Sequence, residues 1–364
     1  MSKAILIKIV TAIVIIGAIG SVVALYTNLW SPSWNPFKEK PEIVLAKAIK
    51  NIQELKTFHY TGKMKIEFLN KEKFSIGIDM TGDIDNTNKD IPKSSVSIKG
   101  SFLGEGMELS VKGNLVSIGE EAYGKIEEFP KIPSIVMMFS MLGIDIEKIK
   151  NVWIKIDEKS LKNFYEKLGI KVEKPLPKEE QEKLLNELKE LLKGKEFLKI
   201  KTDLGEKEID GKKVYHYLVL INKEELKKIF PEILDVILKY SQETISQKEK
   251  EEMLKEIPQM IDKAFEKIGE LDFEIWIGKK DKMIYKISFD KEIDISKEMI
   301  SSPSGGKIKI SGNFNFSKFN EKIEIKKPTE FKTLDEIIVV PDWMKNFYQF
   351  YQEGTFPEGL QLPQ

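Results

Sequence analysis

The chain has 364 residues, enough for one large domain or two ordinary ones, and contains no Cys, which excludes disulfides, thiolate nucleophiles and Cys metal sites. Its 58 basic residues, all of them Lys, balance 58 acidic residues, so no net charge attracts it to nucleic acid. The lack of Arg also excludes the bidentate contacts that guanidinium groups make with phosphates and carboxylates.

The N-terminal region, residues 1–30, predicts a membrane anchor. Residues 9–30 carry no charge and would span about 33 Å as a helix, enough to cross the hydrocarbon core of a bilayer. Lys3 and Lys8 precede this run and Trp30 ends it, which places the N-terminus in the cytoplasm and the rest of the chain outside. The alternative is a signal peptide cleaved near residues 22–24, which would give a secreted protein. We favour a single-pass anchor in the cell membrane, because the apolar run is longer than a usual signal core.

After a Pro-rich tether at 31–41 and an amphipathic helix at 43–56, a period of two dominates the sequence. Large apolar residues or Gly alternate with polar residues from 57 to 68, and the alternation recurs through 74–84, 96–102, 107–111, 283–289 and 308–316. Such alternation predicts strands with one buried and one wet face. Polar and Gly-rich turns are expected at 70–71, 85–88, 104–106 and 113–114.

The middle of the chain interleaves helices with further strands. Pro130 and Pro133 interrupt the first strand series and precede a Met-rich apolar segment at 134–144. The patterns then predict a strand at 151–157, helices at 158–168 and 178–193, a hairpin of 195–204 with 212–221, helices at 223–241 and 248–268, and strands near 271–278, 282–293 and 306–319. A Ser/Gly-rich turn at 301–306 precedes the last strand, and the tail at 331–364 is rich in aromatics and Pro.

The fold class predicted from this order is α+β, with roughly eleven strands in an antiparallel sheet and helices as its cover. No compositional break marks the midpoint, so we expect one domain over 42–330. A second domain is the alternative, because the length exceeds the commonest domain size.

Several local sequences resemble a known superfamily. They are YGKI at 123–126, VWIKID at 152–157 and IDGKKVYHYLVLINKEEL at 209–226, together with the leading helix and the late three-strand block. Over 42–327 the chain resembles the bacterial lipoprotein-carrier superfamily of LolA-type and LppX-type envelope proteins. The resemblance implies a strongly curved, unclosed half-barrel whose concave apolar face is partly covered by helices and holds acyl chains. LppX-type proteins are anchored through a Cys, and the known carriers use an Arg near the cavity; this chain has neither.

We therefore expect a membrane-tethered, extracytoplasmic, non-enzymatic protein that binds a lipid or other hydrophobic ligand, with an envelope protein as a further partner. The expected cavity is lined by strand residues and by Met residues of a mobile lid: Phe58, Met64, Phe68, Ile76, Met80, Ile98, Phe102, Leu109, Met137, Met138, Met141, Tyr285, Phe289 and Phe314. Two alternatives stay open. The Met-rich segment is ordinary core, or the whole chain is a structural or protein-interaction module, a group that includes envelope sensors and cell-wall assembly accessories, whose core is filled and holds no ligand.

Nothing in the sequence predicts catalysis, a cofactor or a metal. His59 and His216 are the only histidines, and we interpret both as structural strand residues. The run from Asp83 to Asn88 alternates like a calcium loop but lacks the Gly and Glu that such a loop needs, so we interpret it as a hairpin turn. No nucleophile-elbow, Walker or dinucleotide motif occurs.

Overall fold

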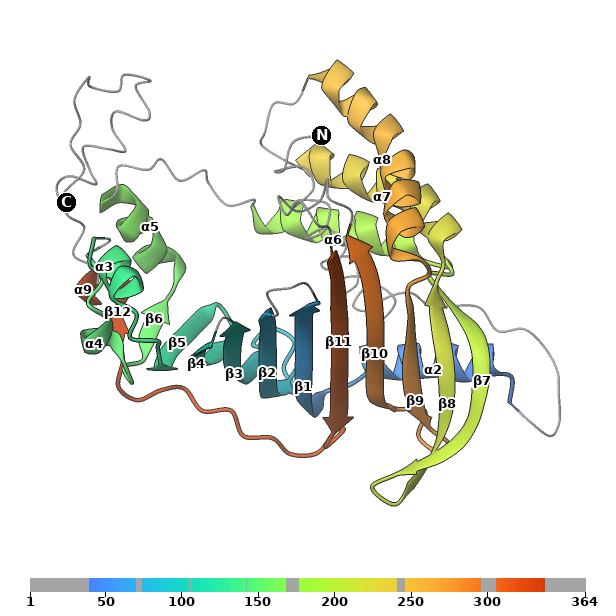
Figure 1. Ribbon diagram of the computed structural model, residues 1–364, viewed down its shortest axis with the longest axis horizontal. Coiled ribbons are helices and arrows are strands. Elements are labelled where there is room, and N and C mark those ends of the chain that lie inside the picture. The colour runs from blue at the N-terminus through green and yellow to red at the C-terminus, as the bar shows by residue number, and fades with distance from the viewer. Residues whose placement is uncertain are drawn as a thin grey trace. The chain divides into compact units, whose positions relative to one another are not determined.

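The computed structural model describes residues 39–69, 74–104, 106–141, 143–167, 177–240, 246–295 and 306–337 (Figure 1). Its helices are α2 (Pro41–Gln53), α3 (Pro133–Met141), α4 (Ile146–Ile149), α5 (Glu158–Lys167), α6 (Lys178–Leu192), α7 (Lys223–Tyr240), α8 (Gln247–Ile268) and α9 (Leu334–Ile337). Its strands are β1 (Thr57–Phe68), β2 (Phe74–Asp85), β3 (Lys93–Gly104), β4 (Met107–Ile118), β5 (Glu121–Glu128), β6 (Ile154–Ile156), β7 (Leu198–Ile209), β8 (Lys212–Ile221), β9 (Asp272–Gly278), β10 (Ile284–Ile295), β11 (Gly306–Ser317) and β12 (Lys332–Thr333).

The strands form a 12-stranded sheet in the order β12-β6-β5-β4-β3-β2-β1-β11-β10-β9-β8-β7. The ladders described residue by residue are antiparallel, apart from the parallel pairing of β12 with β6. The α+β class is therefore confirmed. The predicted anchor at 9–30 and the tail beyond 337 lie outside the described residues. Among the helices within the described ranges, none is long and apolar enough to cross a membrane.

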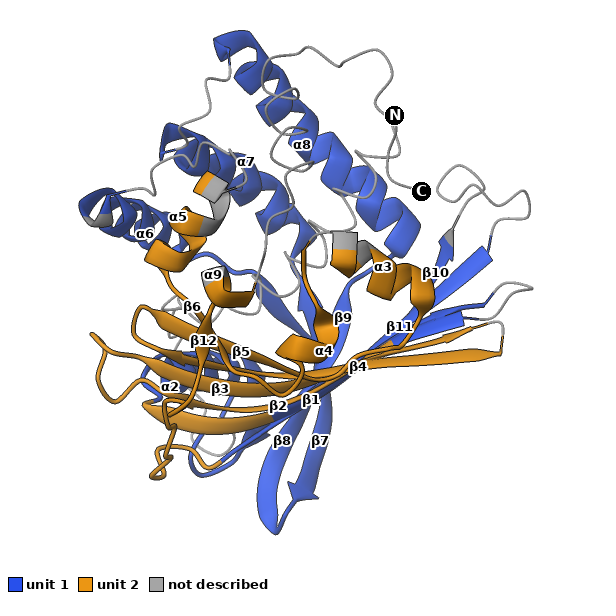
Figure 2. Ribbon diagram, turned by 90° about the vertical axis from the view of Figure 1, so that its left-hand side faces the viewer, with its two compact units in different colours: residues 1–55, 61–76, 176–317 blue, residues 56–60, 77–175, 318–364 orange. Residues whose placement is uncertain are grey.

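The chain divides into two compact units, shown in different colours in Figure 2. Unit 1 comprises residues 1–55, 61–76 and 176–317, and unit 2 comprises residues 56–60, 77–175 and 318–364. Each unit has its own hydrophobic cluster. The expectation of a single domain over 42–330 stays a prediction.

In unit 1, helix α2 covers the apolar face of β8, β9 and β10. Pro41 supplies the fixed φ that suits the first helical position, and Glu42 complements the dipole of the first turn. The buried side of the helix is formed by Val44, Leu45, Ala48 and Ile49. These residues pack on strand residues that share one face because they are paired across the ladders, among them Tyr217, Ile275 and Ile287. Alternation in the strands and helical spacing in α2 thus meet in one core.

Helices α6, α7 and α8 of unit 1 pack on one another at the end of the neighbouring strands (Figure 1). Leu192, Phe197, Leu226 and Ile229 form their shared core. Ion pairs join the helices farther out: Lys239 Nζ lies 2.7 Å from Glu187 Oε1, and Lys227 Nζ lies 2.6 Å from Asp262 Oδ2. Ser246 and Glu249 cap α8 reciprocally, which satisfies backbone groups at the start of that helix.

In unit 2, strands β3 to β6 form an antiparallel meander, and the segment 318–331, called the strap below, crosses one face of it. Ile325 packs against Val116 of β4 and Tyr123 of β5, with Ile323 beside it. The strap begins by donating from the Asn320 amide to the Thr57 carbonyl at 2.8 Å and ends at β12. The strap is therefore part of the cover of this sheet face.

Three features differ from the sequence predictions. The turn expected at Gly113-Asn114 is wrong, because β4 continues through both residues with unbroken pairing to β3. The strand β12 and the helix α9 lie at the start of the tail, where no strand or helix was predicted. The helix α4 was not predicted, since four residues are too few to show a helical period.

Truncating the α2 contact should destabilise unit 1. Ile49 is 3% exposed in that core, so Ile49→Ala should cost about 2–4 kcal/mol and raise local opening by roughly thirtyfold or more. Hydrogen exchange of peptides from β8 and β9 measures this. The control is Leu185→Ala, because Leu185 is 55% exposed on α6 and its loss should change exchange little. Equal exchange in both variants would contradict the assignment of α2 to the core.

Candidate functional site

The sheet of unit 2 has a second face, opposite the strap, that is apolar, and none of the described strand residues that form it is charged. Paired residues share a face, and the pairs on this one include Ile98 with Gly113, Phe102 with Leu109, and Leu115 with Gly124. We call it the apolar face; its residues are Val96, Ile98, Gly100, Phe102, Met107, Leu109, Val111, Gly113, Leu115, Gly124, Ile126, Ile154 and Ile156. Along β3 it extends about 20 Å from Val96 to Phe102, at the usual rise of a strand.

The apolar face is exposed to an extent that a core would not show. Leu115 is 47% exposed, Val111 is 40% exposed, and Met107 at the start of β4 is 48% exposed. Scattered apolar residues are common on protein surfaces, but contiguous apolar residues on one sheet face mark an interaction or ligand surface.

Glycines give the apolar face a depressed diagonal. Gly100 of β3, Gly113 of β4 and Gly124 of β5 lie on neighbouring strands, each offset by two residues from a direct pair. A Cβ atom at Gly100 would meet nothing closer than the Val111 carbonyl oxygen at 4.0 Å. At Gly124 it would touch only the side chains of Leu115, at 3.5 Å, and Ile156, at 3.9 Å. At Gly113 a Cβ atom would come within 2.9 Å of the Lys125 carbonyl oxygen, so the space for a narrow apolar group lies above Gly100 and Gly124.

The structure distributes the predicted cavity residues over both units. In unit 2, Ile98, Phe102 and Leu109 lie together on the apolar face, and Phe58 and Met80 are half-buried on β1 and β2. In α3 of the same unit, Met137 is 51% exposed, while the side chains of Met138 and Met141 lie outside the described structure.

The other predicted residues belong to unit 1. The rings of Phe68 and Phe74 stack with centroids 3.9 Å apart, and those of Phe289 and Phe314 with centroids 6.4 Å apart. Met64 is half-buried on β1, and Ile76 on β2 is 39% exposed.

Tyr285 departs from the alternation that places it with Phe289. The register between β9 and β10 shifts between Ile284 and Lys286, so a bulge interrupts the period of two. Tyr285 is buried there, accepts a hydrogen bond from Lys212 Nζ at 3.0 Å and donates one to Asp281 Oδ2 at 2.5 Å. Burial, with the Asp281 contact, raises the pKa of Tyr285. Its surroundings are those of a polar hairpin end.

Sequence reasoning missed Leu115, Ile126, Ile154 and Ile156 as members of the apolar face. The signal for Leu115 was present, because Leu109, Val111, Gly113 and Leu115 continue the period of two. Reading Gly113-Asn114 as a turn hid it. For β6, Ile154 and Ile156 alternate within the strand predicted at 151–157, but the pairing with β5 that places them on this face is not visible in the sequence.

The strap side of unit 2 carries a network of charges. Glu121 accepts hydrogen bonds from Lys155 at 2.8 Å, from Lys327 of the strap at 2.7 Å and from Tyr123 at 2.9 Å. These donors, Lys155 first, lower the pKa of Glu121 to about 2. The carboxylate thus joins β5, β6 and the strap.

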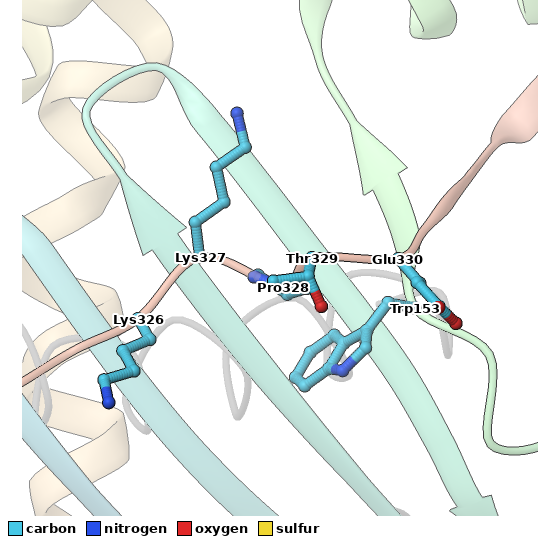
Figure 3. Close-up of a pocket in the computed structure, with 6 residues that line it drawn as sticks. All are labelled: Trp153, Lys326, Lys327, Pro328, Thr329 and Glu330. Atoms are coloured by element: carbon cyan, nitrogen blue, oxygen red, sulfur yellow. The ribbon is translucent and has the colours of Figure 1, made fainter.

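A shallow hollow of about 400 Å³ lies beside this network, lined by Trp153, Lys326, Lys327, Pro328, Thr329 and Glu330 (Figure 3). Lys125 Nζ lies 5.0 Å from the centroid of the Trp153 ring. Trp153 also packs against the cluster of Val116, Tyr123 and Ile325. Because Lys125 covers the ring and the lining charges have both signs, the hollow offers no clear preference for a ligand.

Each histidine is hydrogen-bonded to one carboxylate. His59 Nδ1 lies 2.8 Å from Asp83 Oδ1, and His216 Nε2 lies 2.6 Å from Glu274 Oε2. His216 also stacks on Trp276 with ring centroids 4.3 Å apart. Within the described residues, His, Asp and Glu form no group of the size needed to hold a metal ion. Both histidines therefore have structural partners at hand.

Comparison with known proteins gives matches at the level of structure. No protein-family model matches the sequence, and no curated protein matches it. The chain is similar to the lipoprotein LppX of Mycobacterium tuberculosis, at 11% identity and a TM-score of 0.30, with 79% of this chain and 100% of that chain covered. It is similar to LprF of Mycobacterium bovis at 12% identity and a TM-score of 0.31, covering 79% of this chain and 98% of that one.

A third similar structure is a putative outer membrane lipoprotein-sorting protein domain from Vibrio parahaemolyticus. Its identity is 9% and its TM-score 0.16, with 73% of this chain and 87% of that chain covered. The chain is thus similar to solved structures of LppX-type and lipoprotein-sorting proteins, as its sequence predicts. At these TM-scores the likeness carries no argument about the ligand, which depends on the residues of this chain.

The Glu121 network should make strap docking sensitive to acid. The pKa of Glu121 is about 2 in the fold against 4.5 for the free side chain, so its stabilising effect is complete above about pH 4.5 and disappears as the pH falls towards 2. Wild type should therefore exceed Glu121→Gln in thermal midpoint at pH 7, and the difference should shrink between these values. Glu147→Gln is the control, because the Glu147 side chain is 66% exposed in its pair with Lys131. A difference between wild type and Glu121→Gln that is independent of pH would contradict the role of the carboxylate.

Proposed function

We propose that the protein binds an acyl chain or another hydrophobic ligand against the apolar face of unit 2, and that it works outside the cytoplasm without catalysing a reaction. The observation that carries this proposal is the exposure of Leu115, Val111 and Met107 on a sheet face without charge. The segment 9–30 would tether it to the cell membrane. The ligand-lining roles of the residues predicted from sequence, and a half-barrel that encloses them, are part of the same proposal.

Burial alone supplies enough affinity for such a ligand. Each methylene removed from water contributes about 0.8 kcal/mol, so ten of them contribute about 8 kcal/mol before the cost of immobilising the ligand. The apolar face has no charged group to pair with a head group. The polar end of the ligand would therefore remain in water at the rim, because an unpaired buried charge is costly.

The way in which the two faces of the unit 2 sheet are covered supports a bound ligand rather than simple core packing. The strap already covers the other face of these strands through Ile323 and Ile325. On the apolar face, by contrast, the side chains of Leu115 and Val111 are 47% and 40% exposed. A ligand that buries them would complete the second layer that a sheet requires.

The rival function is a protein-interaction or structural module of the envelope. Unit 1 favours it, because α2 fills the apolar face there and leaves Tyr217 at 0% and Ile275 at 2% exposure. On this reading a partner protein rather than a lipid covers the apolar face of unit 2. The two functions differ in whether a small hydrophobic molecule accompanies the purified chain.

A charge on the apolar face should abolish ligand binding. The full chain, purified from a membrane or envelope fraction, would be examined by native mass spectrometry and lipid extraction. We expect a bound lipid in wild type and at least about tenfold less in Leu115→Asp, because the carboxylate would have to be desolvated against the ligand. Leu103→Asp is the matched control, since Leu103 is 55% exposed on the opposite face of β3. A lipid-free wild type that takes up none on incubation would favour the interaction module.

Filling the glycine diagonal should separate stability from binding. Gly100 is in a strand with open space above it, so Gly100→Leu should leave the fold as stable or more stable. The same change should weaken binding of a long-chain fatty acid by about tenfold, because the leucine occupies the space of several methylenes. Thermal denaturation and a fluorescent fatty-acid titration measure the two effects. Unchanged affinity in a stable Gly100→Leu variant would show that the ligand does not use the diagonal.

A further inference from the structure

Helix α3 differs from an ordinary surface helix in having no charged face. Its sequence is PSIVMMFSM, and the charge-free run extends from Ile132 to Ile144 between Lys131 and Asp145. Charged residues make up 32% of the whole chain. A surface helix of a globular protein normally turns an apolar stripe inward and charged residues outward. The side of α3 that faces away from the protein therefore lacks the charged residues that a water-exposed helix face normally has.

The structure shows which side of α3 is held and which is open. Phe139 contacts Phe129 edge to face, with ring centroids 5.2 Å apart, and Ile135 is half-buried. On the open side, Met137 is 51% exposed and Val136 is 37% exposed. The helix thus has apolar residues on both sides, one docked and one presented to the surroundings.

Helix α3 is held in place by α4 and, through α4, by strand β5. Helix α3 packs on α4, whose Ile146 and Ile149 are buried. The Asp145 carboxylate caps α4 by accepting from the Glu147 amide at 3.2 Å. The Asn151 amide donates to the Ile126 carbonyl at 2.7 Å and fixes the far end of α4 to β5. The helix that carries the exposed Met137 is therefore held in place by α4, which is itself fixed to β5.

Helix α3 is also continuous with the apolar face. Ile126 belongs to that face, and Phe129, which holds α3, follows it by three residues in the same segment of unit 2. A ligand that enters beside α3 would reach strand β5 of the apolar face within a few residues of chain.

We propose that α3 inserts its Val136–Met137 side into the surface of a lipid bilayer and is the point at which the ligand leaves the membrane for the apolar face. This inference rests on the proposed function. At about 13 Å the helix is too short to span a hydrocarbon core of about 30 Å, so it lies in the interfacial layer. Unbranched Met side chains adapt to disordered acyl chains, which have no fixed shape to match.

The flanking charges indicate a neutral rather than an anionic bilayer surface. Lys131 and Lys148 are 76% and 80% exposed, but Glu147 lies 3.1 Å from the first and Asp145 lies 3.2 Å from the second. The local charges therefore balance. Insertion should be driven by apolar burial and should change little with salt.

The absence of Cys from the whole chain permits a direct test, because one introduced thiol labels one position. The full chain carrying Met137→Cys, labelled with an environment-sensitive fluorophore, would be reconstituted into phosphatidylcholine liposomes that contain acyl-chain quenchers. We expect a blue-shifted emission that the quenchers remove, at low and high salt alike. Leu103→Cys, an exposed apolar position on the strap side of β3, is the matched control and should remain unquenched. A Met137 label that is no more quenched than the Leu103 label would overturn the proposal.

A second experiment separates insertion from ligand binding. A photoreactive fatty acid would be supplied to the full chain either within liposomes or within detergent micelles, and crosslinks to β3–β5 would be measured. Met137→Asp and Val136→Asp should slow crosslinking in liposomes by about tenfold, the effect of losing one large apolar side chain from the bilayer, and leave it unchanged in micelles. Equal crosslinking in liposomes, or a loss in micelles as well, would overturn the membrane role. If wild type gives no β3–β5 crosslinks in micelles while the Met137 label is quenched, the insertion is upheld and the proposed function fails.

Discussion

The packing of Ile325 against Val116 and Tyr123 determines which surface of unit 2 is available. A half-buried strand has one apolar and one polar face, yet here apolar residues lie on both faces of β4. The strap seals one of them, and the Glu121 carboxylate joins it to β5 and β6. Because the chain uses its own segment on that side, the face with Leu115 and Val111 is the one that an outside molecule can cover. An apolar sheet face needs a covering layer, and because the strap covers one face, the face with Leu115 and Val111 is the one that still needs such a layer.

Unit 1 shows what the same pattern becomes when a helix covers it. Its strands alternate as those of unit 2 do, but α2 places Leu45 and Ile49 on the apolar side, and Tyr217 and Ile277 lose all exposure. Alternation in a sequence therefore predicts that a face is apolar without predicting its cover. The cover comes from contacts between segments far apart in the chain, as residues 41–53 and 212–221 are here. A bound ligand and a packed helix are equivalent solutions as far as the strand pattern is concerned.

The long strands and helices were predictable because each extends over several periods. Strand β4 was cut short at Gly113-Asn114 because the local turn signal was given more weight than the continuing alternation through Leu115. Tyr285 left its expected face because a bulge, which local sequence does not specify, shifts the register at Ile284–Lys286. Strand β12, two residues long, is held by its pairing with β6 rather than by a pattern of its own. The sequence therefore predicted most of the strands that carry the candidate site, but not the pairing that brings their residues together on one surface.

The lack of charge on the apolar face limits how the protein can discriminate between ligands. A site without a fixed cation or anion gains little from one head group over another, because recognition of a head group requires paired polar atoms that this face does not have. Shape remains, and the recess of this face is the space above Gly100 and Gly124, where an added Cβ atom would meet no other atom closer than 3.5 Å. Selectivity should then follow the thickness and branching of the hydrocarbon. Selectivity by hydrocarbon is also consistent with entry at the charge-free helix α3, because a ligand recognised by its hydrocarbon is available in the bilayer that α3 would contact.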